Sequence, residues 1–153
     1  MSLEVMVEKA QTIAQRIFDE SGELLPMWHV ETAMGENIIL STPLGDADEK
    51  EQLTQALKMF FKQKNVIRYV FMTEVWFKTM KKDEPRFIGE VRHQPDRKEA
   101  VMLAGEDRDT GVSIMVQFEI DRSSGKPVLL SPSKFDSPSQ GRFTNMFVYE
   151  TQQ

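Results

Sequence analysis

The stretch 66–79 constrains the fold most, because it is apolar on both faces when read as a strand. One face carries Ile67, Tyr69, Phe71, Val75 and Phe77, and the other carries Val66, Val70, Met72 and Trp76. A strand with apolar side chains on both faces needs cover on both sides. We therefore expect this stretch to be a central strand of a sheet.

Two segments have the spacing of amphipathic helices. Residues 3–20 place apolar side chains on one helical face and charged or amide side chains on the other. Ser2 can cap the start of this helix, and Gly22 can end it. A second helix follows Asp46 or Asp48, either of which can cap it. Its expected buried stripe consists of Leu53, Ala56, Leu57, Phe60 and Phe61.

Further strands follow from alternating or apolar runs between turn residues. We expect them at 24–33, 37–42, 99–104, 112–121, 127–130 and 143–149. The run 112–121 alternates strictly, so one of its faces should be buried and the other exposed. Residues 80–98 form a long connector, for which a functional or anchoring role is expected. Residues 131–142 are rich in Ser and Pro and are predicted to be a loop.

The order of elements, α-β-β-α-β-β-β-β-β, predicts an α+β fold with two amphipathic helices. Strands that follow one another through hairpins favour a mainly antiparallel sheet, with the helices packed on one side. The second helix could carry a crossover connection, so a mixed sheet stays open as an alternative. The length of 153 residues suits a single domain spanning 1–153.

Composition narrows the classes of function. The net charge of −5 repels phosphate-rich partners, so nucleic acid is not an expected partner. The chain has no cysteine, which excludes disulfides, thiolate metal sites and a cysteine nucleophile and favours a cytoplasmic location. No apolar run approaches the roughly 20 residues of a membrane helix, so no membrane partner is expected.

The sequence also lacks the common catalytic signatures. There is no phosphate-binding glycine motif and no nucleophile elbow. His29 and His93 are the only histidines, and their spacing supports no metal site. We therefore expect no catalytic residue, no metal and no cofactor, and favour a protein that is not an enzyme.

Glu74 is the most informative residue, because on the strand 66–79 it shares a face with Met72 and Trp76. A carboxylate against apolar surface needs a partner, and Arg97 is the first candidate, ahead of Arg68 and Arg92. One hypothesis is a structural pin, in which a Glu74–Arg97 pair holds the connector on the sheet. The other is a binding pocket, and the residues that would form it are Glu74, Trp76, His93, Asp96 and Arg97.

These residues also carry a resemblance. Glu74 and Trp76 at a strand end, followed by Pro95, Asp96, Arg97 and Glu99, resemble a group of small bacterial and phage proteins with a Glu-x-Trp strand end and a Pro-Asp-Arg-x-Glu motif. This chain departs from that pattern in having Thr73 and Val75 where Ser and Ala are typical. The resemblance implies a bacterial or phage origin, and it implies no activity.

Two functions follow as expectations. The first is a non-enzymatic binding or accessory protein that contacts a protein partner or a second copy of itself as a homodimer. The alternative is a small enzyme or ligand-binding domain with a pocket around Glu74, Trp76, His93 and Arg97.

Overall fold

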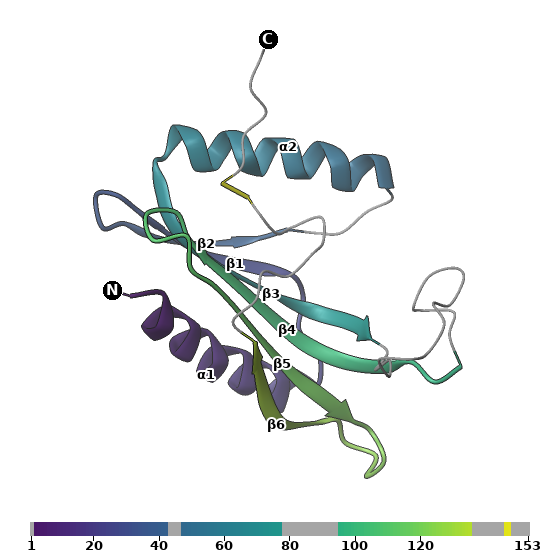
Figure 1. Ribbon diagram of the computed structural model, residues 1–153. Coiled ribbons are helices and arrows are strands. Elements are labelled where there is room, and N and C mark those ends of the chain that lie inside the picture. Colours follow the sequence, from purple (N-terminus) through teal and green to yellow (C-terminus); the bar gives the residue numbers. More distant parts are fainter. Residues whose placement is uncertain (1, 43–46, 78–94, 136–145, 148–153) are drawn as a thin grey trace, which may run out of the picture.

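The computed structural model describes residues 2–42, 47–77, 95–135 and 146–147, which form two helices and six strands (Figure 1). The helices are α1 (Leu3–Ser21) and α2 (Ala47–Gln63). The strands are β1 (Met27–Thr32), β2 (Asn37–Ser41), β3 (Val66–Phe77), β4 (Lys98–Asp107), β5 (Ser113–Asp121) and β6 (Val128–Phe135).

The six strands form one sheet in the order β2-β1-β3-β4-β5-β6, and every neighbouring pair is antiparallel. The α+β class and the antiparallel sheet are thus confirmed, and the mixed-sheet alternative is wrong. The reason lies in the placement of β1. Strands β2 and β3 run in the same direction and α2 connects them as a crossover, but β1 lies between them, so they do not pair.

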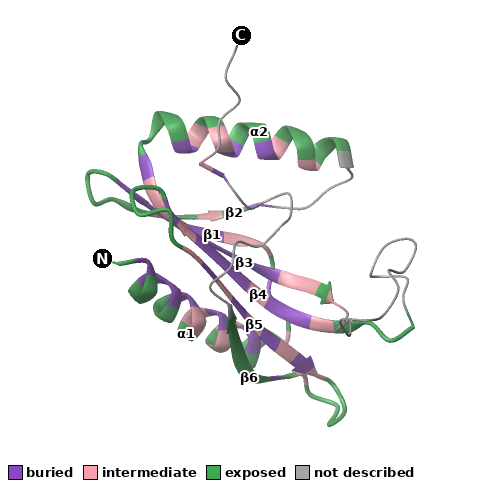
Figure 2. Cartoon of the chain, viewed as in Figure 1, coloured by how far each residue is buried: buried purple, intermediate pink, exposed green. Residues whose placement is uncertain are grey.

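Helices α1 and α2 cover opposite faces of the sheet, so the expectation that both pack on one side is wrong (Figure 2). The cluster under α1 includes Met6, Ala10, Phe18, Val70, Met72, Val101, Leu103, Val116 and Phe118. The cluster under α2 consists of Trp28, Val30, Leu57, Phe61, Val66, Tyr69, Phe71 and Met146. Strand β3 supplies both clusters, which is why each face needed its own helix.

Strand β3 is the central strand that its sequence predicts. It pairs with β1 on one side and β4 on the other. Val70 and Met72 face α1, while Tyr69 and Phe71 face α2, and all four side chains are almost fully buried. The alternation of apolar side chains along β3 therefore joins the two layers of the core.

Both predicted caps of α1 are present. The Ser2 hydroxyl accepts from the Val5 N–H at 3.3 Å. At the other end Gly22 is left-handed, with φ of 75°, and its N–H donates to the Phe18 carbonyl at 2.7 Å. A left-handed residue is strained for any side chain, so glycine suits this position.

The main difference in strand length is at β6. This strand runs to Phe135 and so extends into residues 131–135, which were predicted to be a loop. Pro132 is compatible with a strand here because β6 is an edge strand. Most of the connector, residues 80–94, lies outside the described residues. So does the predicted strand 143–149, apart from Met146 and Phe147, which pack against the α2-side cluster.

Neither helix of the described residues combines the length and apolarity that a membrane-spanning helix requires. Within the same described part of the chain, no group of three His, Asp or Glu side chains could hold a metal ion.

Candidate functional site

A groove of about 390 Å³ lies where β3 ends, β4 begins and β5 ends. These ends meet because β3 and β5 both run antiparallel to β4. The groove is lined by Trp76, Pro95, Arg97, Lys98, Glu99, Glu119, Ile120 and Arg122. We call it the Trp76 groove.

Trp76 is the large aromatic side chain of the groove. Its residue surface is 44% exposed, in contrast to the other tryptophan, Trp28, which is fully buried. The Arg97 guanidinium carbon lies over the Trp76 ring, 4.8 Å from its centroid. This is cation–π geometry, which holds the arginine over one face of the ring.

Arg122 is the second cation of the groove, and it bridges two carboxylates. Its Nε donates to the Glu99 carboxylate, and its Nη2 lies 3.6 Å from Glu74 Oε1. The hydrogen bond to Glu99, with the charges of Glu99 and Glu74, raises the pKa of Arg122 above its ordinary value. The guanidinium therefore ties the end of β5 to β4 and β3.

Glu74 does face the α1 side with Met72, as expected, but its predicted ion pair with Arg97 is wrong. Its Oε2 accepts from the Leu24 N–H at 3.2 Å, and its other oxygen faces Arg122. The carboxylate thus holds the segment between α1 and β1, not the connector. Arg97 lies over Trp76 instead.

The structure brings two of the predicted site residues, Trp76 and Arg97, into one groove. Asp96 is exposed beside them, and Glu74 contacts the groove residue Arg122. His93 lies outside the described residues. Arg122 and the pairing role of Glu99 were missed, although the alternation that placed Ile120 on the buried face of β5 also places Arg122 there.

Comparisons of the chain with protein-family models, with curated proteins and with solved structures found no match. The resemblance to bacterial and phage proteins therefore stays a prediction.

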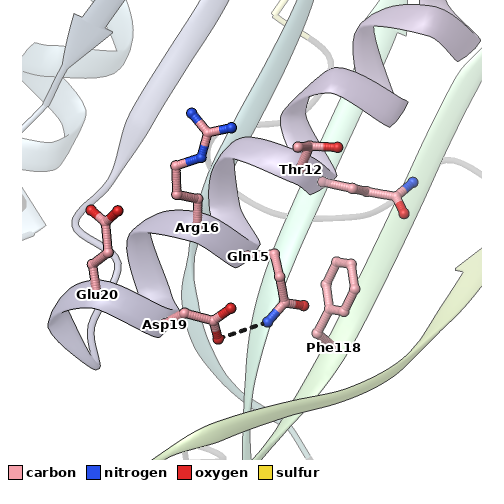
Figure 3. Close-up of a pocket in the computed structure, with 7 residues that line it drawn as sticks. Thr12, Gln15, Arg16, Asp19, Glu20 and Phe118 are labelled. Atoms are coloured by element: carbon pink, nitrogen blue, oxygen red, sulfur yellow. Dashed lines mark hydrogen bonds between the residues drawn. The ribbon is translucent and has the colours of Figure 1, made fainter.

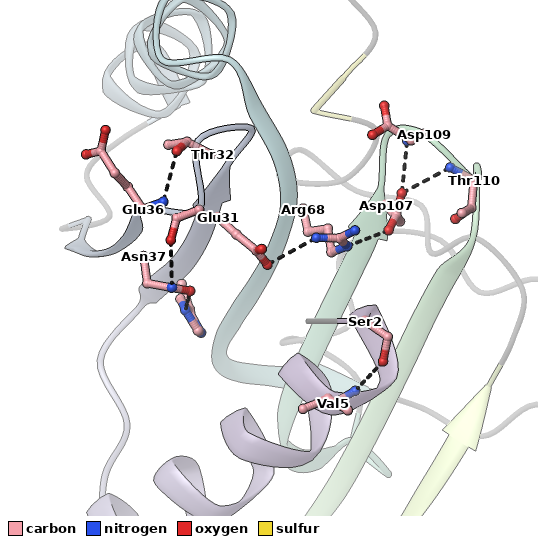
Figure 4. A network of polar contacts seen from close by, with 12 residues as sticks. Ser2, Val5, Glu31, Thr32, Glu36, Asn37, Arg68, Asp107, Asp109 and Thr110 are labelled. Atoms are coloured by element: carbon pink, nitrogen blue, oxygen red, sulfur yellow. Dashed lines mark hydrogen bonds and ion pairs between the residues drawn. The ribbon is translucent and has the colours of Figure 1, made fainter.

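A separate polar network holds the opposite end of β3 (Figure 4). Arg68, considered above as a partner of Glu74, pairs instead with Glu31 at 3.1 Å and with Asp107 at 2.7 Å. The second oxygen of Asp107 accepts from the N–H groups of Asp109 and Thr110. These contacts join β1, β3 and β4 through almost fully buried carboxylates, so we assign the network a structural role.

A second groove, of about 500 Å³, runs along α1 over Phe118 (Figure 3). Its other lining residues are Gln11, Thr12, Gln15, Arg16, Asp19 and Glu20. The Gln15 amide donates to Asp19 one helical turn away, at 3.0 Å. Such contacts are typical of a solvated helix face, and we assign no site there.

Proposed function

We propose that this chain is a non-enzymatic binding protein and that the Trp76 groove receives a segment of a protein partner. The observation that carries the proposal is the exposed Trp76 ring with the Arg97 guanidinium stacked on it. Tryptophan and arginine are the residue types that most often dominate the energetics of protein interfaces.

The ion pairs within the groove favour a partner that binds through an apolar side chain over one that binds through a charged side chain. Arg122 is paired with Glu99 and Glu74, and the Lys98 ammonium lies 3.6 Å from Glu119. Charged side chains that are already paired gain little from one more exposed ion pair. We therefore expect the partner to place an apolar or aromatic side chain on Trp76, and expect its binding to depend weakly on salt.

The proposal is tested by comparing Trp76→Ala with Met59→Ala. Both change an exposed apolar side chain, and Met59, at 61% exposure, lies on α2 away from the groove. Untagged protein purified gently from its host is analysed by native mass spectrometry, and circular dichroism checks the fold of each variant. A stoichiometric protein partner kept by the wild type and by Met59→Ala but lost by Trp76→Ala is the expected result.

A partner that Trp76→Ala retains in full would contradict the assignment to this groove. Repeating the measurement at higher ionic strength tests the apolar anchor, because a partner held by ion pairs would dissociate. We also propose that the protein is cytoplasmic and of bacterial or phage origin, as the sequence led us to expect.

A small ligand in the same groove is the second candidate, because a volume of about 390 Å³ lies in the range of small-molecule sites. The same spectra separate the two. A small stoichiometric extra mass that Arg97→Ala abolishes would favour the ligand.

A further inference from the structure

The two edges of the sheet differ in how well they are protected against pairing. The outer strand β6 carries Pro132, which has no N–H to donate, and Lys134. The register of β5 and β6 also shifts between Phe118 and Ile120. Proline, lysine and bulges are the devices that prevent edge strands from pairing with other chains.

The other edge strand, β2, has none of these devices. Its five residues, Asn37–Ser41, include no charge and no proline, and its pairing with β1 has no register shift. Ile39 at its centre is 54% exposed. A side-chain contact also links β2 to β1, because Asn37 Oδ1 and His29 Nε2 are 2.9 Å apart.

Hydrogen bonds at both ends of the β1–β2 hairpin show which backbone groups of β2 point outward. The backbone N–H of Thr42 donates to the Pro26 carbonyl, and the backbone N–H of Thr32 donates to the Glu36 carbonyl. Opposite residues of an antiparallel pair alternate between bonded and non-bonded pairs. Since residues 36 and 42 are hydrogen-bonded toward β1, residues 38 and 40 are too. Asn37, Ile39 and Ser41 therefore turn their N–H and C=O groups to the outer edge of β2, where no other strand of the described residues lies.

We propose that β2 pairs antiparallel with β2 of a second copy of this chain, around a twofold axis at Ile39. In this register Ile39 faces Ile39, and Asn37 faces Ser41, so every outward backbone group of the strand finds a partner. Ile38 faces Leu40, and both of these side chains already pack against the α2-side cluster. The pairing extends that cluster across the axis.

A second copy is chosen because the exposed apolar residue Ile39 lies at the centre of the strand, where it would meet its own counterpart on a twofold axis. The chain has a net charge of −5, yet this segment is uncharged, so the copies meet without opposing like charges. Glu36, at the end of the hairpin turn, would face Thr42. A twofold axis perpendicular to the sheet also keeps both α1 helices on one face and both α2 helices on the other.

This inference uses strand β2 and does not rest on the Trp76 groove. The mass of the wild type in sedimentation equilibrium, at protein concentrations on the order of 1 to 100 µM, is the first test. We expect twice the chain mass of 17.7 kDa at the upper end. Ile39→Lys should stay a monomer, because two lysines would face each other at the axis. Leu130→Lys on β6 is the matched control, with Leu130 42% exposed, and should dimerise like the wild type.

Crosslinking locates the axis. The chain has no cysteine, so a single introduced one reports without background. Facing residues of a bonded pair have Cα atoms about 5.5 Å apart, so Ile39→Cys should be joined across the dimer by a short bifunctional thiol reagent. Leu130→Cys, on the far edge of each sheet, should not. A wild type that remains monomeric, or equal crosslinking of the two variants, would overturn the proposal.

Discussion

At the scale of single residues, Asp107 shows how a buried carboxylate is stabilised. Burial alone would raise the pKa of its carboxyl, but hydrogen bonds from Thr110 N–H, Arg68 and Asp109 N–H together lower the pKa below its ordinary value. A lowered pKa in the folded state gives stability that is present above the unfolded pKa and is lost as the pH falls through the folded one. The contribution should therefore disappear in the acid range below about pH 4.

Replacing Asp107 by Asn should lower the free energy of unfolding at neutral pH by about 1 to 3 kcal/mol, because Arg68 loses a charged acceptor. The loss relative to wild type should shrink as the pH falls below 4. Urea unfolding over a pH series measures both effects. Asp109→Asn is the control, since that side chain is 59% exposed and should cost far less. An equal loss in the two variants, or one that does not change with pH, would contradict the assignment.

Gly105 determines how closely α1 approaches β4. A Cβ atom at this position would lie 3.0 Å from Leu3 Cδ1 and 3.3 Å from both Val7 Cγ2 and the Tyr69 carbonyl oxygen. Gly105→Ala should lower the free energy of unfolding by about 1 to 3 kcal/mol through overpacking. Thermal unfolding measures this loss. In a double-mutant cycle, Leu3→Ala should recover part of it, and strictly additive losses would show that Leu3 is not the obstacle.

At the scale of elements, α2 is attached to the sheet by a narrow apolar stripe. Phe61 is fully buried, and its ring centroid lies 5.9 Å from Trp28 and 5.2 Å from Tyr69. Phe61→Ala should lower the free energy of unfolding by about 3 to 5 kcal/mol. Phe60, which is only partly buried, provides the matched control, and Phe60→Ala should cost clearly less. Chemical denaturation measures both free energies of unfolding. Equal losses in the two variants would mean that α2 is rotated about its own axis, so that Phe60 and Phe61 are equally buried.

At the scale of the whole molecule, the clusters under α1 and α2 share β3, so we expect them to unfold together. Trp28 lies in the α2-side cluster, and Trp76→Phe makes it the only tryptophan. In that variant, Trp28 fluorescence and far-ultraviolet circular dichroism should give the same urea midpoint. Separate midpoints would show that one layer of the core unfolds without the other.

The periodicity of the sequence determined the local features of this protein. It predicted α1 with both caps, the alternating face of β5 and the two-faced central strand β3, because helix and strand periods depend only on neighbouring residues. It also placed Glu74 on the correct face of its strand. Trp76 and Arg97 were singled out as candidate site residues on a different ground, because Glu74 shares a strand face with Trp76 and needs a charged partner.

Only the tertiary structure decided which residues meet. Periodicity assigns a side chain to a face but does not identify the strand beside it. Arg68 and Asp107, which are 39 positions apart, pair because β3 and β4 align them, and Arg122 reaches Glu74 across β4 in the same way. Likewise, β1 lies between β2 and β3, so these two strands do not form a parallel pair, and β2 is an edge of the sheet that the described residues form. These outcomes depend on long-range strand pairing, which arises only when distant parts of the chain bury their apolar faces together.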